Sequence, residues 1–402
     1  MTDLSRREFA ALAAAAAASP FIGSAAAVQI RPAINPPDDR FFRQTLPRLM
    51  DATGAPGLAA GIVQNGTLVW ETYEGLGEAG TTRAIAAETL FPAASLGKPV
   101  FAYAALRLAE QGQLDLDRPL KSYVPDHAPA DARGDKVTAR HVLSHTSGFR
   151  NWRNAADEPL VPEFDPGSRF QYSGEGFYYL SRAVEKITGR AVQRFMEESL
   201  FLPFGMPSSS YAWRDDTETR LVLGHNRGAL ARPPSREFSN RLFAHAKSLG
   251  RPLASFTHEE LVAAMTAMKP APRPLPNFIP TNVAGSLMTT VGDYGRFLAR
   301  LLSPRGAAHE VTLKMRAQML APRVRLNRAL AWGLGWGLET AGGRDYIWHW
   351  GDNGTIKNFV LAHVPSHSAV VVFTNDARGM RIAEAIVKAA SGHDHVAFDW
   401  LG

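Results

Sequence analysis

Runs of strand-forming residues lie near both ends of the chain, and this arrangement restricts the fold more than any other feature. Near the N-terminal end, residues 58–63 and 68–73 are apolar-rich and are joined by a turn containing Asn65-Gly66, a strong hairpin signal. Three further runs near the C-terminal end precede a helical pattern at 382–390; they cover residues 346–350, 356–364 and 369–375. We expect one antiparallel sheet built from both chain ends and flanked by helices, an α/β (α+β) fold.

The middle of the chain has helical periodicity instead. Apolar residues recur at helical spacing in residues 100–111, 176–187, 192–200 and 257–268. A chain of 402 residues exceeds the roughly 250 to 300 at which one core stops growing, so we expect two lobes. We predict a sheet lobe at about 40–98 and 285–402, with an inserted helical lobe at about 99–284. Residues 270–276 are proline-rich and predict a stiff connector, whereas residues 214–256 show no clear pattern.

Residues 1–27 have the order of a twin-arginine export signal. Arg6-Arg7 precede an alanine-rich apolar stretch that ends in the small residues Ala25-Ala26-Ala27. The apolar run breaks at Ser19-Pro20, short of the roughly 20 residues that a membrane-spanning helix needs. We therefore expect removal of the signal, a domain at 28–402 with no stable membrane anchor, and a periplasmic or secreted location.

Composition excludes several classes of function. The net charge of +6 is not gathered in runs, which argues against nucleic-acid binding. The chain has no cysteine, so disulfides, thiolate catalysis and cysteine-ligated metals are excluded. His141 and His145 are four residues apart, but they lack the glutamate of a zinc-binding helix, so we expect a structural role for both. We predict no metal site and no cofactor.

The chemistry begins at Ser95-Leu96-Gly97-Lys98, the only S-x-x-K sequence in the chain. If a helix begins at Ser95, Ser95 Oγ and Lys98 Nζ lie on one face within reach of each other. A serine hydroxyl needs a base, and a lysine amine serves only when its pKa is depressed, as the positive end of a helix dipole would do. Two observations oppose this reading: serine is a common helix N-cap, and Pro99 favours a later helix start.

Four further stretches resemble the class C β-lactamase-like serine hydrolases, which include DD-peptidases, family VIII carboxylesterases and β-lactamases. They are LSHTSGF at 143–149, YSG at 172–174, LPFGM at 202–206 and HWG at 349–351, with a fifth match at 284–290. The resemblance runs from about residue 57 to the C-terminus, and it implies a penicillin-recognising serine hydrolase fold.

The resemblance also implies roles for single residues. Ser95 looks like the nucleophile, Lys98 its base, and Tyr172 the phenol that relays protons, with a pKa lowered by the nearby lysine. The backbone amides of Ser95 and Asp352 would form the oxyanion hole. The stretch His349-Trp350-Gly351 would line the substrate cleft, with Gly351 letting substrate approach the strand.

Two departures from the family pattern bear on the substrate. His349 stands where many relatives carry lysine, so a substrate carboxylate would be bound weakly or only in acid. Gly174 stands where asparagine is usual, which removes an amide that would hold a substrate carbonyl. We therefore expect a serine hydrolase that acts on a small acyl ester or amide. The alternatives are a β-lactamase or DD-carboxypeptidase acting on β-lactams or peptidoglycan peptides, and a non-catalytic peptidoglycan-binding relative.

Overall fold

The computed structural model describes residues 31–127, 129–154, 158–231, 234–268, 280–304, 309–341 and 344–402. The predicted export signal and the predicted proline-rich connector lie outside these residues. Within the described ranges, no helix is long and apolar enough to cross a membrane.

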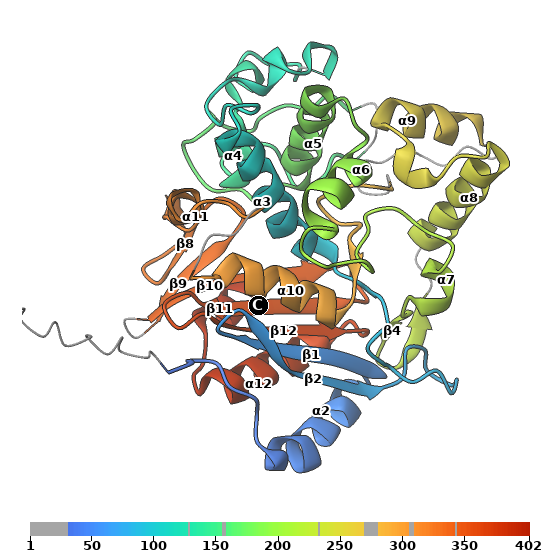
Figure 1. Cartoon of the computed structure of the whole chain (residues 1–402), viewed down its shortest axis with the longest axis vertical. Helices are drawn as coiled ribbons and strands as arrows, with labels where there is room; N and C mark the ends of the chain where they lie inside the picture. Colours follow the sequence, from blue (N-terminus) through green and yellow to red (C-terminus); the bar gives the residue numbers. More distant parts are fainter. Residues whose placement is uncertain are drawn as a thin grey trace, which may run out of the picture. The chain divides into compact units, whose positions relative to one another are not determined.

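A large antiparallel sheet contains eight strands among the described residues, in the spatial order β2-β1-β12-β11-β10-β9-β8-β7. β1 pairs with β12, with Leu58 opposite Thr374, so strands from both ends of the chain lie side by side in one sheet, as predicted (Figure 1). The strands are β1 (Gly57–Gln64), β2 (Thr67–Gly75), β7 (Val324–Arg325), β8 (Leu330–Trp332), β9 (Gly337–Ala341), β10 (Arg344–Asp352), β11 (Lys357–His363) and β12 (Ser368–Thr374).

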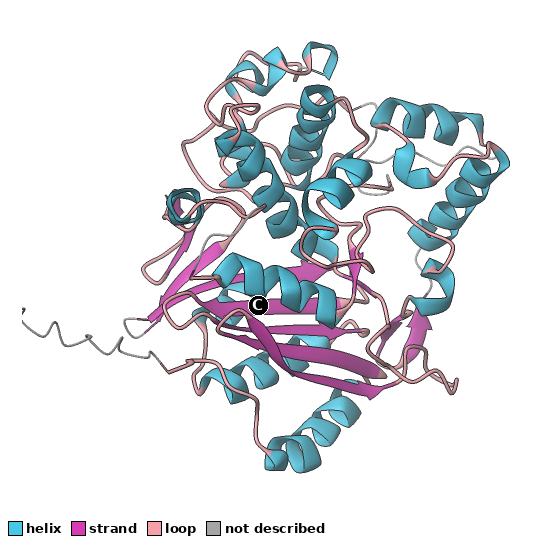
Figure 2. Ribbon diagram, viewed as in Figure 1, coloured by secondary structure: helices cyan, strands magenta, loops and turns pink. Residues whose placement is uncertain are grey.

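Helices cover both faces of this sheet (Figure 2). α10 packs against β1, β2 and β12, while α12 packs against β11 and β12 on the other face and also contacts α2. The helices are α2 (Leu46–Thr53), α3 (Gly97–Glu110), α4 (Ala139–Leu143), α5 (Gly174–Thr188), α6 (Val192–Met196), α7 (Thr217–Arg220), α8 (Pro234–Ser248), α9 (His258–Ala267), α10 (Val291–Leu302), α11 (Leu313–Met319), α12 (Gly379–Ser391) and α13 (Val396–Leu401).

The burial of each strand follows from this layering. β12 is buried along its whole length because helices lie on both of its faces, and its sequence is correspondingly continuous in apolar residues. β2, at the sheet edge, alternates between exposed and partly buried positions. Asn65 and Gly66 both have positive φ, 50° and 79°, as a two-residue type I′ turn between β1 and β2 requires.

Several elements differ from the sequence prediction. The helix α2 precedes the hairpin of β1 and β2 and was not predicted. The predicted helix at 192–200 is divided into α6 and a π-helical turn, η7 (Glu197–Phe201). The short strands β7 to β9 were not predicted, because two to five residues are too few to show a period. The unassigned stretch at 214–256 contains α7, α8 and a small two-stranded sheet of β4 (Gly224–Asn226) and β5 (Ala229–Ala231).

A second small sheet lies directly before the S-x-x-K sequence. β3 (Phe91–Pro92) pairs with β6 (Met288–Thr289), with Phe91 opposite Thr289. The Ala93 amide donates a hydrogen bond to the Leu287 carbonyl at 2.7 Å, and the Asn358 side chain on β11 donates to the Pro92 carbonyl at 2.9 Å. The backbone that leads to Ser95 is therefore fixed by two later parts of the chain.

Candidate active site

Ser95 lies on a single 3₁₀ turn, η3 (Ala94–Leu96), that runs directly into α3. The residue before it, Ala94, has φ of 52°, a left-handed conformation that costs energy for a residue with a side chain. Such strain is retained where surrounding contacts impose it, and it is found most often at functional sites. The backbone therefore presents Ser95 at a sharp bend rather than within a regular helix.

Ser95 is not the N-cap of α3. That position is occupied by Leu96, which makes no side-chain capping bond, and the helix begins at Gly97. Pro99 therefore occupies the third position of the helix, where a backbone N–H would have no intrahelical partner. The two sequence-based objections to a Ser95–Lys98 pair are both removed.

Lys98 lies beside the serine. Its Nζ is 2.9 Å from Ser95 Oγ and donates a hydrogen bond to the Ala284 carbonyl at 2.7 Å. The side chain is buried, with the amine 4.8 Å from the centre of the Tyr172 ring. Burial lowers the pKa of Lys98 well below its ordinary value. The depression thus comes from loss of solvation, whereas the sequence prediction attributed it to the helix dipole.

A neutral amine in this position can act as a base. It has two N–H bonds and one lone pair, and the Ala284 carbonyl accepts one of the two N–H bonds. The lone pair can then accept the Ser95 hydroxyl proton across the 2.9 Å contact. The geometry is that of an activated oxygen nucleophile.

Tyr172 packs next to the same pair with its hydroxyl oxygen buried, but its electrostatics differ from the prediction. Burial raises the pKa of Tyr172, and proximity to Ser95 only partly opposes that increase. The predicted lowering by a lysine ammonium is wrong, because burial dominates and Lys98 itself favours the neutral state. Tyr172 is therefore a protonated phenol, suited to donating a proton to a leaving group rather than to abstracting one.

Aromatic neighbours hold the Tyr172 ring in place. Its centroid lies 4.2 Å from that of His145 and 4.7 Å from that of Trp350. The adjacent Ser173 amide donates to His145 Nδ1 at 3.0 Å, and burial lowers the pKa of His145 well below its ordinary value. His145 is thus a neutral side chain that positions the tyrosine and its loop.

The paired histidines do not form a metal site. α4 ends at Leu143, so His141 and His145 do not share a helix. His141 Nδ1 accepts a hydrogen bond from the Thr138 amide in the capping box of α4. In the part of the chain that the structure describes, no group of three or more His, Cys, Asp or Glu side chains could hold a metal ion.

His349 lies on β10 but does not present its side chain to solvent. The residue is 0% exposed, and its Nδ1–H donates to the Trp350 carbonyl at 2.8 Å. Burial, with a smaller contribution from Lys98, lowers the pKa of His349 to about 3. His349 is therefore neutral and covered near neutral pH, and weak or acid-dependent binding of a substrate carboxylate stays a prediction.

The other two residues of the stretch also have structural neighbours. Trp350 packs against Tyr172, as described above, and against Trp400. A Cβ on Gly351 would lie 2.3 Å from the Ala93 carbonyl oxygen. Glycine is therefore required at 351 for β10 to pack against the serine loop, residues 93–96. This packing explains the glycine without the predicted approach of substrate.

A cavity of about 420 Å³ opens beside the serine, and Ser95 and Asp352 both line it. Its walls also include two tryptophans, Trp152 and Trp213, and the cation Arg236. Sequence reasoning missed these three residues. Arg236 falls in the unassigned stretch at 214–256, Trp213 lies just before that stretch, and Trp152 follows the LSHTSGF motif without belonging to it. Trp152 and Trp213 lie in loops, where site residues are common, and only that placement could have drawn attention to them; Arg236 lies on α8.

Gly174 lies under one of these tryptophans. A Cβ at this position would meet the Trp152 ring at 2.4 Å, so the indole occupies the space that a larger residue would need. The Gly174 amide donates to Asn151 Oδ1 at 2.8 Å, which fixes the start of α5 to the same loop. The missing asparagine is thus matched by an aromatic side chain on the cavity wall.

This packing gives a testable expectation for Gly174→Asn. The new side chain must displace Trp152, so the unfolding free energy should fall by about 1 to 3 kcal/mol. In G174N/W152A the clash is absent, and the double variant should be less destabilised than the sum of the single variants. Urea denaturation of the four proteins measures the coupling; additive effects would contradict it.

Comparison with known proteins agrees with the predicted resemblance. Esterase EstB of Burkholderia gladioli is 29% identical over 234 residues, which cover 45% of this chain and 58% of that esterase. A penicillin-binding protein homologue from Pyrococcus abyssi superimposes with a TM-score of 0.67 at 19% identity, covering 87% of this chain and 77% of that chain. A class C beta-lactamase gives a TM-score of 0.66 at 15% identity, covering 86% and 93%.

The structural matches confirm the predicted fold class. The decisive comparison is with a family model described as Beta-lactamase. It matches residues 42–391, a range that includes Ser95, Tyr172 and the strands β10 to β12. This chain belongs to the Beta-lactamase family.

Proposed function

We propose that this protein is a serine hydrolase that forms an acyl-enzyme at Ser95 and acts on small acyl esters or amides. One observation supports the proposal above all others: Ser95 Oγ lies 2.9 Å from a buried lysine amine, at the edge of a cavity of about 420 Å³. The described residues provide a nucleophile, a base, a phenol and a space for substrate within one site.

In the first step, Lys98 takes the Ser95 proton as Oγ attacks the substrate carbonyl carbon. The tetrahedral oxyanion is stabilised by the Ser95 and Asp352 backbone amides, which act where charge develops. The proton held by Lys98 then returns through Tyr172 to the leaving-group oxygen or nitrogen, and the acyl group stays on Ser95. Lys98 then takes a proton from water as the water oxygen attacks the acyl carbon, and this proton passes to Ser95 Oγ as the ester bond breaks, which releases the carboxylic acid and regenerates the serine.

The Asp352 side chain is occupied away from this chemistry. One carboxylate oxygen accepts the Gly354 amide at 2.7 Å and the other pairs with Lys357 at 2.5 Å. These contacts neutralise the carboxylate and fix the residue at the end of β10. An Asp352 amide in the oxyanion hole is therefore not accompanied by a free negative charge beside the developing oxyanion.

We expect ester hydrolysis to be faster than β-lactam hydrolysis. The carboxylate of a β-lactam is one carbon away from the lactam nitrogen and would have to lie close to β10, where His349 is neutral and covered. Gly174 also provides no side-chain amide for a lactam substituent. With purified protein, kcat/KM for p-nitrophenyl butyrate should exceed that for nitrocefin by at least about tenfold. Turnover of nitrocefin at an equal or higher rate would instead favour the β-lactamase alternative.

A D-peptidase is the second candidate, and the structural match to a penicillin-binding protein homologue favours it. The same acyl-transfer groups would serve an amide bond, with Tyr172 protonating the leaving nitrogen. Release of D-alanine from a D-alanyl-D-alanine peptide, measured beside the two chromogenic substrates, distinguishes this candidate from the esterase.

Export by the twin-arginine route, with activity in the periplasm or outside the cell, is also part of the proposal. It rests on Arg6-Arg7, the alanine-rich stretch and the small residues before Val28. Loss of this segment would leave the family domain without a stable membrane anchor.

A further inference from the structure

The charges around the cavity are unevenly placed. Of the described residues that line it, only Arg236 and Asp352 carry a formal charge. Asp352 is paired with Lys357 at 2.5 Å, and His349, the residue expected to bind a carboxylate, is neutral and buried. The cationic group available to a ligand in this cavity is therefore the guanidinium on α8.

Arg236 is held in a fixed orientation with part of its fork unused. The side chain is 14% exposed, and its Nε and Nη2 both bind a single oxygen, Oε1 of Glu218, at 3.2 and 2.8 Å. The Nη1 group has one long contact, 3.5 Å to the Val222 carbonyl. The guanidinium also lies 5.8 Å from the centre of the Trp213 ring. One nitrogen of a planar donor is thus left with weak bonding at the cavity wall.

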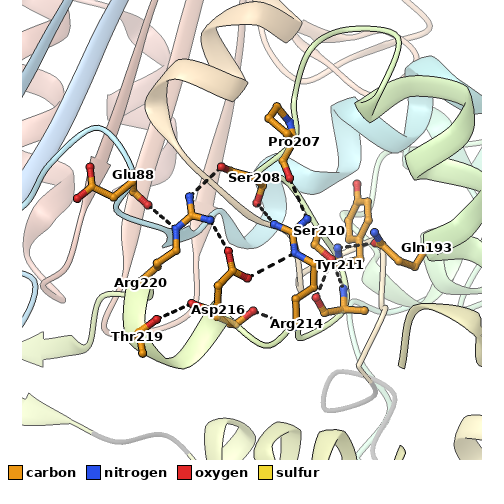
Figure 3. Close-up of polar contacts among 12 residues, drawn as sticks. Glu88, Gln193, Pro207, Ser208, Ser210, Tyr211, Arg214, Asp216, Thr219 and Arg220 are labelled. Carbon is orange, nitrogen blue, oxygen red and sulfur yellow. Dashed lines mark hydrogen bonds and ion pairs between the residues drawn. The ribbon is translucent and has the colours of Figure 1, made fainter. Parts of the chain in front are cut away.

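The partner of Arg236 is itself anchored. Glu218 belongs to α7, which is only one turn long, and a polar network on both sides keeps this turn in place (Figure 3). Arg214 donates to the Pro207 and Ser208 carbonyls, each at 2.9 Å. Arg220 donates to the Glu88 carbonyl at 3.0 Å and pairs with Asp216. The network therefore fixes the turn that orients the guanidinium.

We propose that Arg236 binds a carboxylate carried by the substrate, several bonds from the scissile carbonyl. This inference rests on the proposed function, because it concerns which esters or amides are turned over at Ser95. A carboxylate accepts hydrogen bonds from a guanidinium in a planar, charge-assisted geometry. Leu221 and Met288 also line the cavity, and their apolar side chains suit an apolar spacer. The preferred substrates are thus half-esters or half-amides of dicarboxylic acids.

The competing explanation is that Arg236 only ties α8 to α7. Glu218 is 53% exposed and also accepts a hydrogen bond from Asn240 at 3.3 Å, so it remains partly hydrated and does not fully cancel the arginine charge. Glu218→Gln separates the two explanations, because it removes the ion pair and keeps the cation. A structural role requires both partners, whereas substrate binding requires only the guanidinium.

The experiment compares p-nitrophenyl butyrate with the p-nitrophenyl half-esters of succinic, glutaric, adipic and suberic acids. Wild-type protein should favour at least one acidic ester over the neutral one by tenfold or more in kcat/KM. R236Q should lose 10- to 100-fold on that ester, mainly through KM, and change less than twofold on the butyrate. E218Q should keep the acid preference. R251Q is the matched control, since Arg251 forms an exposed pair with Glu260 and does not line the cavity.

Each result supports or overturns the inference. Arg236 would have a structural role if R236Q lost kcat/KM equally on acidic and neutral esters. The same conclusion would follow if E218Q lost the preference for the acidic ester as R236Q does. Absence of acid preference at every chain length, with the butyrate hydrolysed, would overturn the inference and leave the proposed function standing. If no ester is hydrolysed, the hydrolase proposal fails, and calorimetric titration of S95A with monomethyl glutarate tests the carboxylate site by itself. Binding by S95A that is lost in S95A/R236Q supports the carboxylate site. Absence of binding to S95A overturns the carboxylate site as well.

Discussion

Replacement of Ser95 by alanine is expected to lower kcat/KM for p-nitrophenyl butyrate by at least about 10⁴-fold, the scale seen when a catalytic nucleophile is removed. Covalent labelling by a fluorophosphonate should disappear in the same variant. The reason is that the oxygen 2.9 Å from Lys98 is the atom that we propose is acylated. The unfolding free energy should change little. The lost hydroxyl has the lysine amine as its neighbour, and other contacts hold the backbone of η3.

A second serine in this fold provides a demanding control. Ser391 Oγ lies 2.9 Å from His395 Nε2, and His395 Nδ1 lies 3.3 Å from Glu339, which resembles a serine–histidine–carboxylate triad. Ser391 and His395 are buried near the end of α12, and neither lines the cavity beside Ser95. S391A should therefore retain labelling and turnover. Labelling that survives in S95A and disappears in S391A would sink the assignment of the nucleophile. Absence of labelling in the wild type would favour the non-catalytic relative.

Replacement of Lys98 by methionine should reduce kcat/KM by about 10²- to 10⁴-fold and, in addition, change how stability depends on pH. Burial lowers the pKa of Lys98 in the folded protein, whereas the unfolded chain has the ordinary value of 10.5. Between these two pKa values the unfolded chain binds the proton and the folded protein does not. The unfolding free energy of the wild type therefore rises with pH in this interval, by up to about 1.4 kcal/mol per pH unit.

K98M lacks this contribution, so the advantage of K98M over the wild type should shrink as pH increases. From pH 7 to pH 9 the difference in unfolding free energy should fall by up to about 2.7 kcal/mol. The absolute difference at pH 7 also includes the lost hydrogen bond to Ala284, which is why the slope is the sharper measurement. K121M, the control, removes an exposed, ion-paired lysine. Its difference from the wild type in unfolding free energy should change by no more than about 0.5 kcal/mol from pH 7 to pH 9. A flat difference for K98M would mean that Lys98 is charged in the folded protein.

The sequence predicted the features that depend on local pattern. Continuous apolar runs predicted the buried strands β1, β11 and β12, and Asn65-Gly66 predicted the turn. The three-residue spacing of Ser95 and Lys98 predicted their contact, because neighbouring turns of a helix bring such positions together.

What the sequence could not predict depends on how distant segments pack. Lys98, Tyr172 and His349 have shifted pKa values because residues from several later segments cover them, and burial of that kind leaves no local pattern. Gly174 differed from the family pattern, but nothing nearby in sequence indicated that Trp152 occupies the space above it. Arg236 faces the cavity only because α7 and α8 are brought beside Ser95 by tertiary contacts.

The serine loop, residues 93–96, has local turn hydrogen bonds but also depends on contacts with distant parts of the chain. It is held by Leu287, by Asn358 and by the close approach of Gly351, all of them about 190 residues or more further along the chain. During synthesis, these contacts can form only after the last central strands have left the ribosome. We therefore expect a truncated chain that ends ahead of these strands to carry the S-x-x-K sequence without the contacts that hold Ser95 beside Lys98, and to show no hydrolytic activity.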